Sequence, residues 1–409
     1  MSEPQQPSQA TTLPAGAVQL LDAEGTLHED ARFTPYLADL DHTALQRMYR
    51  LMATERRVDA EGTALQRQGQ LALWVPAIGQ EGAQAGALSA LRDADWIFPT
   101  YREHLFALGR GVTPRQLFEL FRGVSHAGWT AEEHRLQPYT LVLAAQTLHA
   151  TGYAWGIQRD QAGWDADRLQ REGQVALACF GDGASSEGDV HESMVFAASY
   201  DLPVVFFCQN NQWAISVPAT TQTRVPLAQR AAGYGFEGVT VDGNDPLAMY
   251  AVTAWAAEQA RTGAGPVLIE AHTFRVGAHT TADDPTKYRT RDEEAAWAGV
   301  DPLERLEAYL RATDAAGEEP DAFFAEVAAE GEELAAAARE AVLSMTGDAI
   351  APLDEVFDTV YAEPHPLVAE EKAWHLAWQA GFADGPDDGP AGTADPAGPN
   401  GSAGRGGAA

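Results

Sequence analysis

The chain has 409 residues, and its 59 acidic and 27 basic side chains give a formal net charge of −32. With 45% apolar residues, a chain of this length can bury a large core, which excludes a protein that is disordered throughout. Lysine and arginine form no cluster that could attract phosphates, so nucleic-acid binding is also excluded.

The two cysteines, Cys179 and Cys208, both lie in apolar runs and are too few for a disulfide framework. We expect buried, reduced thiols, as in a cytoplasmic protein. The first residues show neither a basic leader with an apolar stretch nor an Arg-rich amphipathic pattern, which argues against a targeting signal. No apolar run is long enough to span a bilayer, so we expect no membrane association.

Helical patterns dominate the first part of the chain, after a segment over residues 1–30 that we expect to be disordered or extended. Apolar residues recur at helical spacing over 41–68, and small residues favour a second helix over 81–91. A third helix is predicted over 113–122, where Thr113 can cap the helix and Pro114 occupies its first turn.

Four short apolar runs then predict strands, over residues 174–180, 203–209, 238–243 and 266–274. Segments with helical periodicity separate most of them, including 187–200 and 246–262. Strands that are apolar on both faces and alternate with helices indicate a parallel sheet covered by helices on both sides. The predicted fold class is therefore α/β, with helical N-terminal and C-terminal extensions.

The C-terminal part is acidic and helical, since residues 292–371 contain 22 acidic and 3 basic side chains. Asp301 and Pro302 predict the start of a helix that buries leucines, and a longer helix is expected over 321–345. We assign one domain to residues 31–375, with its C-terminal helices from about residue 292. The Gly/Ala/Pro-rich tail, 376–409, is expected to be disordered.

Polar side chains follow two successive predicted strands. Gly181-Asp182-Gly183 comes after the first strand, and Asn210-Asn211 after the second. Because ligands bind at the carboxyl ends of parallel strands, Asp182 and Asn211 should meet there as oxygen donors suited to Mg²⁺. The glycines, and a helix starting near Ser186, would admit a diphosphate. Taken alone, each motif is an ordinary turn, and the spacing of GDGASSEG does not match a dinucleotide fingerprint.

The spacing of GDG and NN resembles the thiamin diphosphate and Mg²⁺ motif. The wider pattern resembles the alpha subunit of the dehydrogenase component of 2-oxo acid dehydrogenase complexes. The resemblance runs from about residue 71 to 361 and includes IGQEGAQAGAL, TYREH, AAQTLHATGYAWG, GDGASSEGD, NNQWAIS, VDGND and RVGAHTTADDPTKYR.

This resemblance implies roles for particular residues. The metal ligands would be Asp182, Asn211 and the main-chain carbonyl of Trp213. The residues expected to contact the cofactor are Tyr101, Arg102, Leu143, Gly181, Gly183, Ala184, Asn211 and His279. Among these, Arg102 would offer a planar donor fork to the diphosphate, and Leu143 would lie near the aminopyrimidine.

The resemblance also selects His279 as the catalytic residue, in a polar loop after the last predicted strand. A histidine there can donate to a developing oxygen charge near neutral pH. From the sequence alone, a loop histidine is more often merely solvated. Thr280 stands where related proteins can carry a modified serine, and we predict no such regulation here.

Two departures from the family pattern are visible. The segment before residue 146 has Leu141 and Ala145 where relatives carry hydroxyls, which argues against a monovalent-cation site. Gln209 stands where some relatives have an arginine, so diphosphate binding would rely more on Mg²⁺ and Arg102.

The resemblance implies a partner as well, because the glutamate that activates the cofactor belongs to a beta subunit in two-subunit members. We therefore expect an α₂β₂ heterotetramer that decarboxylates a 2-oxo acid and passes the acyl group to a lipoyl domain on the core acyltransferase. The loop sequence HTTADDPTKYR and the sequence DEVFDTVYAE resemble those of branched-chain 2-oxo acid dehydrogenases more than those of pyruvate enzymes. The resemblance therefore favours a branched-chain 2-oxo acid over pyruvate as the substrate. The alternatives are a pyruvate dehydrogenase alpha subunit and, more remotely, a catalytically silent subunit or acidic scaffold.

Overall fold

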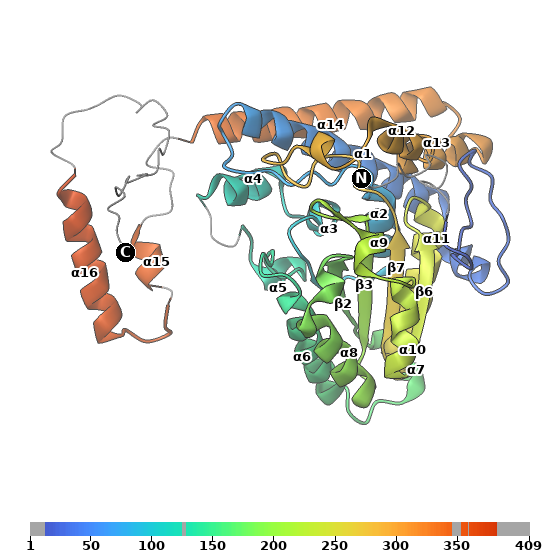
Figure 1. Cartoon of the computed structure of the whole chain (residues 1–409), viewed down its shortest axis with the longest axis horizontal. Coiled ribbons are helices and arrows are strands. Elements are labelled where there is room, and N and C mark those ends of the chain that lie inside the picture. Colours follow the sequence, from blue (N-terminus) through green and yellow to red (C-terminus); the bar gives the residue numbers. More distant parts are fainter. Residues whose placement is uncertain (1–12, 125–127, 346–352, 359, 383–409) are drawn as a thin grey trace, which may run out of the picture. The chain divides into compact units, whose positions relative to one another are not determined.

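The computed structural model describes residues 13–124, 128–345, 353–358 and 360–382 (Figure 1). The chain divides into two compact units, Met1–Gly347 and Asp348–Ala409, which are described separately below. Of the tail predicted to be disordered, 376–409, residues 376–380 are instead helical, and residues 383–409 lie outside the described residues, as do residues 1–12.

The larger unit is built on a five-stranded parallel sheet, which confirms the predicted α/β class. Its strands are β1 (Trp96–Phe98), β2 (Ala176–Gly181), β3 (Val204–Asn210), β6 (Glu237–Asp242) and β7 (Val267–His272). They lie in the order β1-β2-β3-β7-β6. The four predicted strands are confirmed, whereas the sequence analysis missed β1, which at three residues is too short to show a periodicity.

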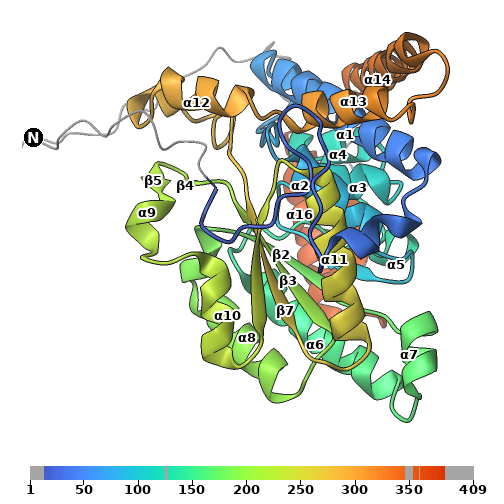
Figure 2. The ribbon, with the colours of Figure 1, turned by 90° about the vertical axis from the view of Figure 1, so that its right-hand side faces the viewer.

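Helices cover both faces of the sheet, as Figure 2 shows. One face packs against α2 (Glu81–Ala90), α3 (His104–Gly109) and α11 (Pro246–Arg261). The other packs against α6 (Ala145–Asp160) and α8 (Gly188–Ser199). Successive residues of each strand point to opposite faces, so the strands buried on both sides are largely apolar, with buried polar residues such as Glu270 of β7 as exceptions.

The predicted helix starts follow from their capping residues. The side chain of Thr113 caps α4 (Pro114–Arg122) in a reciprocal capping box with Gln116, and Asp301 caps α13 (Pro302–Ala312). The remaining helices and short strands of the larger unit are α1 (His42–Arg67), α5 (Ala131–His134), α7 (Ala166–Glu172), β4 (Trp213–Ala214), β5 (Val217–Pro218), α9 (Ala219–Gln222), α10 (Arg230–Tyr234), α12 (Arg291–Ala298) and α14 (Pro320–Leu343).

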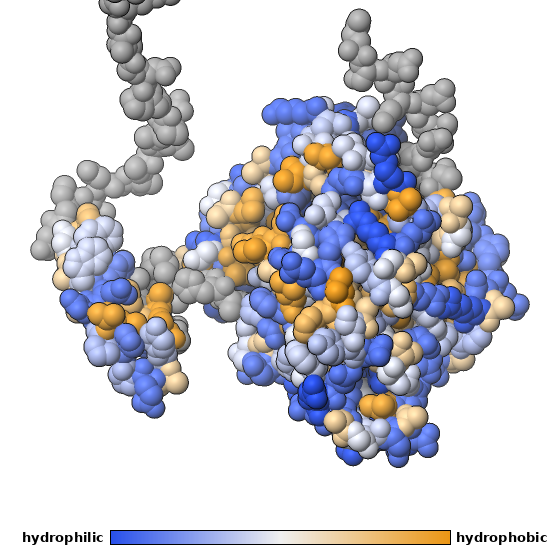
Figure 3. Space-filling view, turned by 60° about the horizontal axis from the view of Figure 1, so that its bottom comes forward, coloured by the Kyte–Doolittle hydropathy of each residue, from blue (hydrophilic) through white to orange (hydrophobic). Residues whose placement is uncertain are grey.

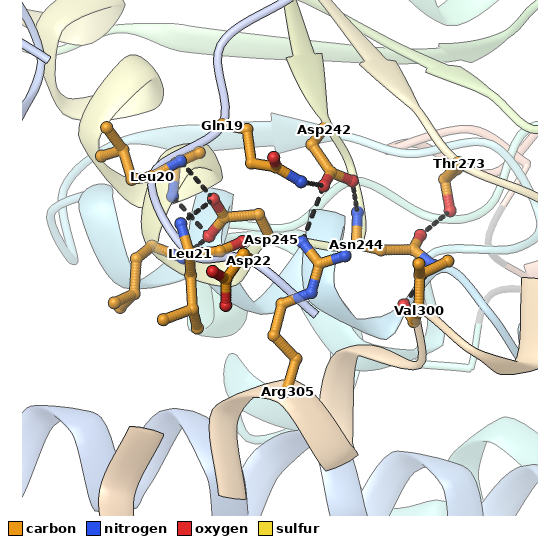
Figure 4. Close-up of polar contacts among 12 residues, drawn as sticks. Gln19, Leu20, Leu21, Asp22, Asp242, Asn244, Asp245, Thr273, Val300 and Arg305 are labelled. Atoms are coloured by element: carbon orange, nitrogen blue, oxygen red, sulfur yellow. Dashed lines mark hydrogen bonds and ion pairs between the residues drawn. The ribbon is translucent and has the colours of Figure 1, made fainter. Parts of the chain in front are cut away.

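The described part of the N-terminal segment is extended and packed against the sheet. Val18 pairs in parallel with Val241 of β6, and Leu20 and Leu21 are fully buried. The carboxylate of Asp245 accepts hydrogen bonds from the backbone N–H groups of both leucines, at 2.6 Å each (Figure 4). Tertiary contacts therefore hold a segment whose sequence showed no regular pattern.

The C-terminal helices of the larger unit pack against α1. Leu303, Leu306 and Leu310 of α13 are buried beside α1, as the sequence predicted, and Val327 of α14 joins the same cluster. Residues 353–382 form α15 (Leu353–Asp358) and α16 (Pro366–Ala380), and these belong to the second unit. Among the described residues, no helix has both the length and the apolar character needed to cross a membrane.

Candidate active site

The predicted oxygen donors meet at the carboxyl edge of the sheet. Asp182 follows the last residue of β2, and Asn211 follows β3, which pairs with β2 so that Gly181 lies beside Gln209. The backbone N–H of Asn211 donates to the carbonyl of Gln209 at 3.0 Å and also acts on the Asp182 carboxylate, whose pKa it helps to lower. Strand register alone therefore brings these two side chains together.

These donors are buried and of the oxygen type. Burial raises the pKa of Asp182 to about 6, although the N–H of Asn211 and the side chain of Gln222 oppose this shift. The carbonyl of Trp213 accepts from Arg275 Nη1 at 3.2 Å, which leaves its second lone pair free for another partner. Within the described residues, no cluster of three or more His, Cys, Asp or Glu side chains is placed to hold a metal ion, so any metal here would depend on a mixed donor set.

A cavity of about 440 Å³ opens at this edge. It brings together every residue that the sequence analysis selected: Tyr101, Arg102, Leu143, Gly181, Asp182, Gly183, Ala184, Asn211, Trp213 and His279. Gly183 has to be glycine, because a Cβ there would lie 2.7 Å from the Cβ of Ala214. The cavity therefore has an oxygen-rich floor at the sheet edge and a wall formed by the loop that follows β7.

Arg102 and His279 are in direct contact across the cavity. One terminal nitrogen of Arg102 donates to the carbonyl oxygen of His279 at 3.0 Å and lies 3.2 Å from His279 Nδ1. The other donates to the carbonyl of Pro76. The guanidinium thus holds the His279 loop, and its predicted contact with a diphosphate stays a prediction.

Comparison with known proteins fits this geometry. The profile of the family described as "Dehydrogenase E1 component" matches residues 49–344, which include the sheet, the cavity and both donor strands. The chain belongs to this family.

The E1 chain is similar to several proteins named as alpha subunits. It is 44% identical to the 3-methyl-2-oxobutanoate dehydrogenase subunit alpha of Mycobacterium tuberculosis (strain CDC 1551 / Oshkosh), over 85% of this chain and 90% of the relative. It is 34% identical to the pyruvate dehydrogenase E1 component subunit alpha of Acholeplasma laidlawii, over 84% and 95%. The pyruvate dehydrogenase E1 component subunit alpha of Bacillus subtilis (strain 168) is 36% identical, over 74% and 79%.

In this E1 chain, His279 is a neutral imidazole at physiological pH. Burial, with the positive charges of Arg102 and Arg275, lowers its pKa to about 4. Because Arg102 can only donate, Nδ1 must be the acceptor in their contact, and the ring proton then resides on Nε2. His279 can therefore donate a hydrogen bond through Nε2 without being charged.

The loop that carries His279 is held by a second set of contacts. The carboxylate of Asp283 accepts from the backbone N–H of His279 at 2.8 Å and from the hydroxyl of Tyr288. Arg275 donates in turn to the Tyr288 hydroxyl at 2.8 Å. These contacts fix the backbone on either side of the imidazole.

The helix that the sequence analysis expected to start near Ser186 is α8, which begins at Gly188 after a 3₁₀ turn over Ala184–Ser186. The N–H groups of Ser185 and Ser186 already donate to the carbonyls of Asp182 and Gly183. Because a tight turn uses these donors, they are not available to an anion.

The polar residues of the cavity lining that sequence reasoning missed include Gln80, Glu103 and Gln146. Gln80 and Gln146 are buried, and each keeps one side-chain atom without a partner, Nε2 and Oε1 respectively. Glu103 accepts from Gln209 Nε2 at 2.6 Å, and Gln84 Nε2 donates to Gln209 Oε1 at 3.0 Å. Both the nitrogen and the oxygen of the Gln209 side chain thus have partners within the protein. The only sequence signal for Gln80, Glu103 and Gln146 was their place inside three of the quoted motifs.

Proposed function

We propose that this E1 alpha chain binds thiamin diphosphate with Mg²⁺ in the cavity at the carboxyl edge of the sheet. The residues present suit such a group, because Asp182 and Asn211 offer buried oxygens and Gly183 leaves the backbone open to the cavity. The unpartnered atoms of Gln80 and Gln146 also require polar partners in this space. Membership of the E1 family, whose members depend on thiamin diphosphate, supports the same assignment.

Each residue then has a defined task. Asp182, Asn211 and the Trp213 carbonyl would hold Mg²⁺ against the diphosphate. When bound, thiamin diphosphate supplies the electron sink that decarboxylation of a 2-oxo acid requires. His279 offers Nε2–H to an oxygen that gains charge, and Arg102 maintains the required tautomer through Nδ1.

A partner subunit would complete this site, and we assign the partner as a beta subunit in an α₂β₂ heterotetramer. Apolar side chains are exposed beside the cavity, on the segment before α6 (Leu141, Val142 and Leu143) and on the turn between β4 and β5 (Ile215). Figure 3 shows one face of the molecule, on which apolar side chains gather among hydrophilic ones. Exposed apolar groups of this kind are typical of a subunit interface. The acyl group would leave on a lipoyl domain of the core acyltransferase, in the cytoplasm.

The substrate we propose is 3-methyl-2-oxobutanoate, a branched-chain 2-oxo acid. The observation that carries this choice is the 44% identity to the 3-methyl-2-oxobutanoate dehydrogenase subunit, against 34% and 36% for the two pyruvate dehydrogenase subunits. These pyruvate relatives keep pyruvate as the second candidate, because their identity extends over most of this chain.

The test is an assay of the chain co-purified with its cognate beta subunit. We expect decarboxylation of 3-methyl-2-oxobutanoate that requires both thiamin diphosphate and Mg²⁺ and that exceeds the rate with pyruvate. A larger kcat/KM for pyruvate would transfer the assignment to the second candidate. Absence of cofactor-dependent turnover with any 2-oxo acid would refute the proposed function.

A further inference from the structure

Gln80 occupies a rigid place in the lining of the cavity, beside Asn211 of the floor. It lies directly before α2 and is fully buried. Gly79, beside it, has φ +92°, and a Cβ there would lie 2.6 Å from the carbonyl oxygen of Phe274. The N–H of Gly79 donates to the Glu81 carboxylate at 2.8 Å, and the carbonyl oxygen of Gly79 accepts from the Thr273 hydroxyl at 2.7 Å. The backbone that carries Gln80 is therefore held on both sides.

The contacts of Asn211 determine which way its carboxamide faces. The backbone N–H of Trp213 donates to Asn211 Oδ1 at 3.3 Å, and Asn211 Nδ2 donates to Gln80 Oε1 at 3.2 Å. Reversing either amide would place two donors or two acceptors against each other. The same logic leaves Gln80 Nε2 as the atom without a protein partner, and Gln80 lines the cavity.

We infer that Gln80 is a positioning residue for the Mg²⁺ site, an inference that rests on the proposed function. By accepting from Nδ2, it keeps Oδ1 of Asn211 as the atom presented to the metal. Without this acceptor the carboxamide can rotate, and its N–H₂ group would then face the cation. The remaining N–H donors of Gln80 face the cavity, where an oxygen of the bound group or a water molecule can accept them.

The test uses the assembly with the beta subunit and three variants. Gln80→Met removes the acceptor at similar volume, whereas Gln80→Glu keeps an acceptor for Asn211 Nδ2. Gln46→Met is the matched control. The side chain of Gln46 donates one partly buried hydrogen bond, to the carbonyl of Ala315 at 2.7 Å, and does not line the cavity. MgCl₂ is titrated by calorimetry at fixed thiamin diphosphate, and the shift in Tm on adding Mg²⁺ is recorded beside kcat.

We expect Gln80→Met to weaken Mg²⁺ binding about tenfold, the effect of losing one hydrogen bond that orients a ligand. Its Tm shift on adding Mg²⁺ should fall accordingly, and the loss in Mg²⁺ affinity should exceed the loss in kcat measured at saturating Mg²⁺. Gln80→Glu should stay within about threefold in Mg²⁺ affinity, and Gln46→Met should match the parent. In an Asn211→Asp background, which has no Nδ2 to hold, Gln80→Met should add no further loss.

Three results would overturn the inference. The first is unchanged Mg²⁺ affinity in Gln80→Met, and the second is equal losses in Gln80→Met and Gln80→Glu. The third is an undiminished loss in the Asn211→Asp background. If Gln80→Met does not fold, Gln80→Ala removes the same acceptor and is judged by the same criteria. A parent assembly that binds neither Mg²⁺ nor thiamin diphosphate would refute the proposed function itself, and the inference with it.

Discussion

The floor and the wall of the cavity are built in different ways. The floor consists of Asp182 and Asn211, at the ends of two hydrogen-bonded parallel strands whose register places them side by side. The wall is the loop after β7, which has no regular secondary structure around His279 and is held by side chains, chiefly Arg102 and Asp283. The floor is thus fixed by backbone pairing, and the wall by a few hydrogen bonds.

This difference separates two kinds of function. Metal and diphosphate binding needs donors at fixed spacing, which the sheet edge supplies through strand register, with Gln80 orienting the carboxamide of Asn211. Catalysis needs one imidazole in a particular tautomer, which depends on Arg102 and on the loop's own anchors. Changes to the floor should therefore remove binding, and changes to the wall should lower kcat while leaving Mg²⁺ binding intact.

The largest effect is expected at the floor, from Asp182→Ala. Loss of the only carboxylate among the proposed ligands should abolish saturable Mg²⁺ binding and lower kcat/KM at least about a thousandfold. Calorimetry and the decarboxylation assay measure these two effects. Glu187→Gln is the control, since Glu187 is an exposed carboxylate on the turn that leads into α8. Parent-like Mg²⁺ binding by Asp182→Ala would mean that the floor does not hold the metal.

The second largest effect is expected from His279→Ala, which changes the loop wall of the cavity and leaves the metal-binding floor intact. His279→Ala removes the Nε2 donor and should lower kcat about a hundredfold or more, a typical loss for a positioned proton donor. Mg²⁺ affinity should stay within about twofold, because no proposed ligand changes. His42→Ala, at the exposed start of α1, is the control. A parallel loss of Mg²⁺ affinity would show that wall and floor are one unit.

The same difference explains what the sequence could reveal. Donors at strand ends are predictable, because a buried strand has an apolar pattern and parallel strands share an edge, so Asp182 and Asn211 followed from Gly181-Asp182-Gly183 and Asn210-Asn211. His279 entered only through the family resemblance, since a polar loop carries no periodic signal.

Other features depend on contacts between distant residues and could not be read from sequence. The use of Arg102 to hold His279 and the pairing of Gln80 with Asn211 each join residues more than 100 positions apart. The buried N-terminal segment depends on Asp245 in the same way.

Acid should distinguish floor from wall without any substitution. Burial raises the pKa of Asp182 to about 6, so without metal the folded chain binds a proton there more readily than the unfolded chain does. Stability from this group is therefore present at low pH and is lost as the pH rises through about 6. Below pH 6, Mg²⁺ has to displace that proton, and its affinity should fall by up to about tenfold per pH unit.

Over the same pH range, His279 in the loop wall should respond in the opposite direction to Asp182, because its pKa is lowered rather than raised. Burial lowers the pKa of His279 to about 4, below its ordinary value of 6.5, so it stays neutral between pH 6 and 5. This group contributes stability above pH 6.5 that is lost as the pH falls toward 4. Mg²⁺ titrations at pH 7.5, 6 and 5 should show a progressive loss of Mg²⁺ affinity. The pH profile of kcat, measured separately, should show no step near pH 6.5 from His279. A kcat step at 6.5 would mean that His279 titrates as an exposed imidazole.

The smallest effect is expected from the anchor of the wall. Asp283→Ala removes the acceptor for the His279 N–H and for the Tyr288 hydroxyl, so the loop should sample other conformations. We expect kcat/KM to fall about tenfold, with unchanged Mg²⁺ affinity and faster proteolysis within the loop. Asp284→Ala is the matched control, because the adjacent Asp284 is exposed and its side chain, among the described residues, hydrogen-bonds to Thr286 and forms an ion pair with Lys287, without holding His279. Equal losses in both variants would mean that the loop's charge, rather than the Asp283 hydrogen bonds, supports the wall.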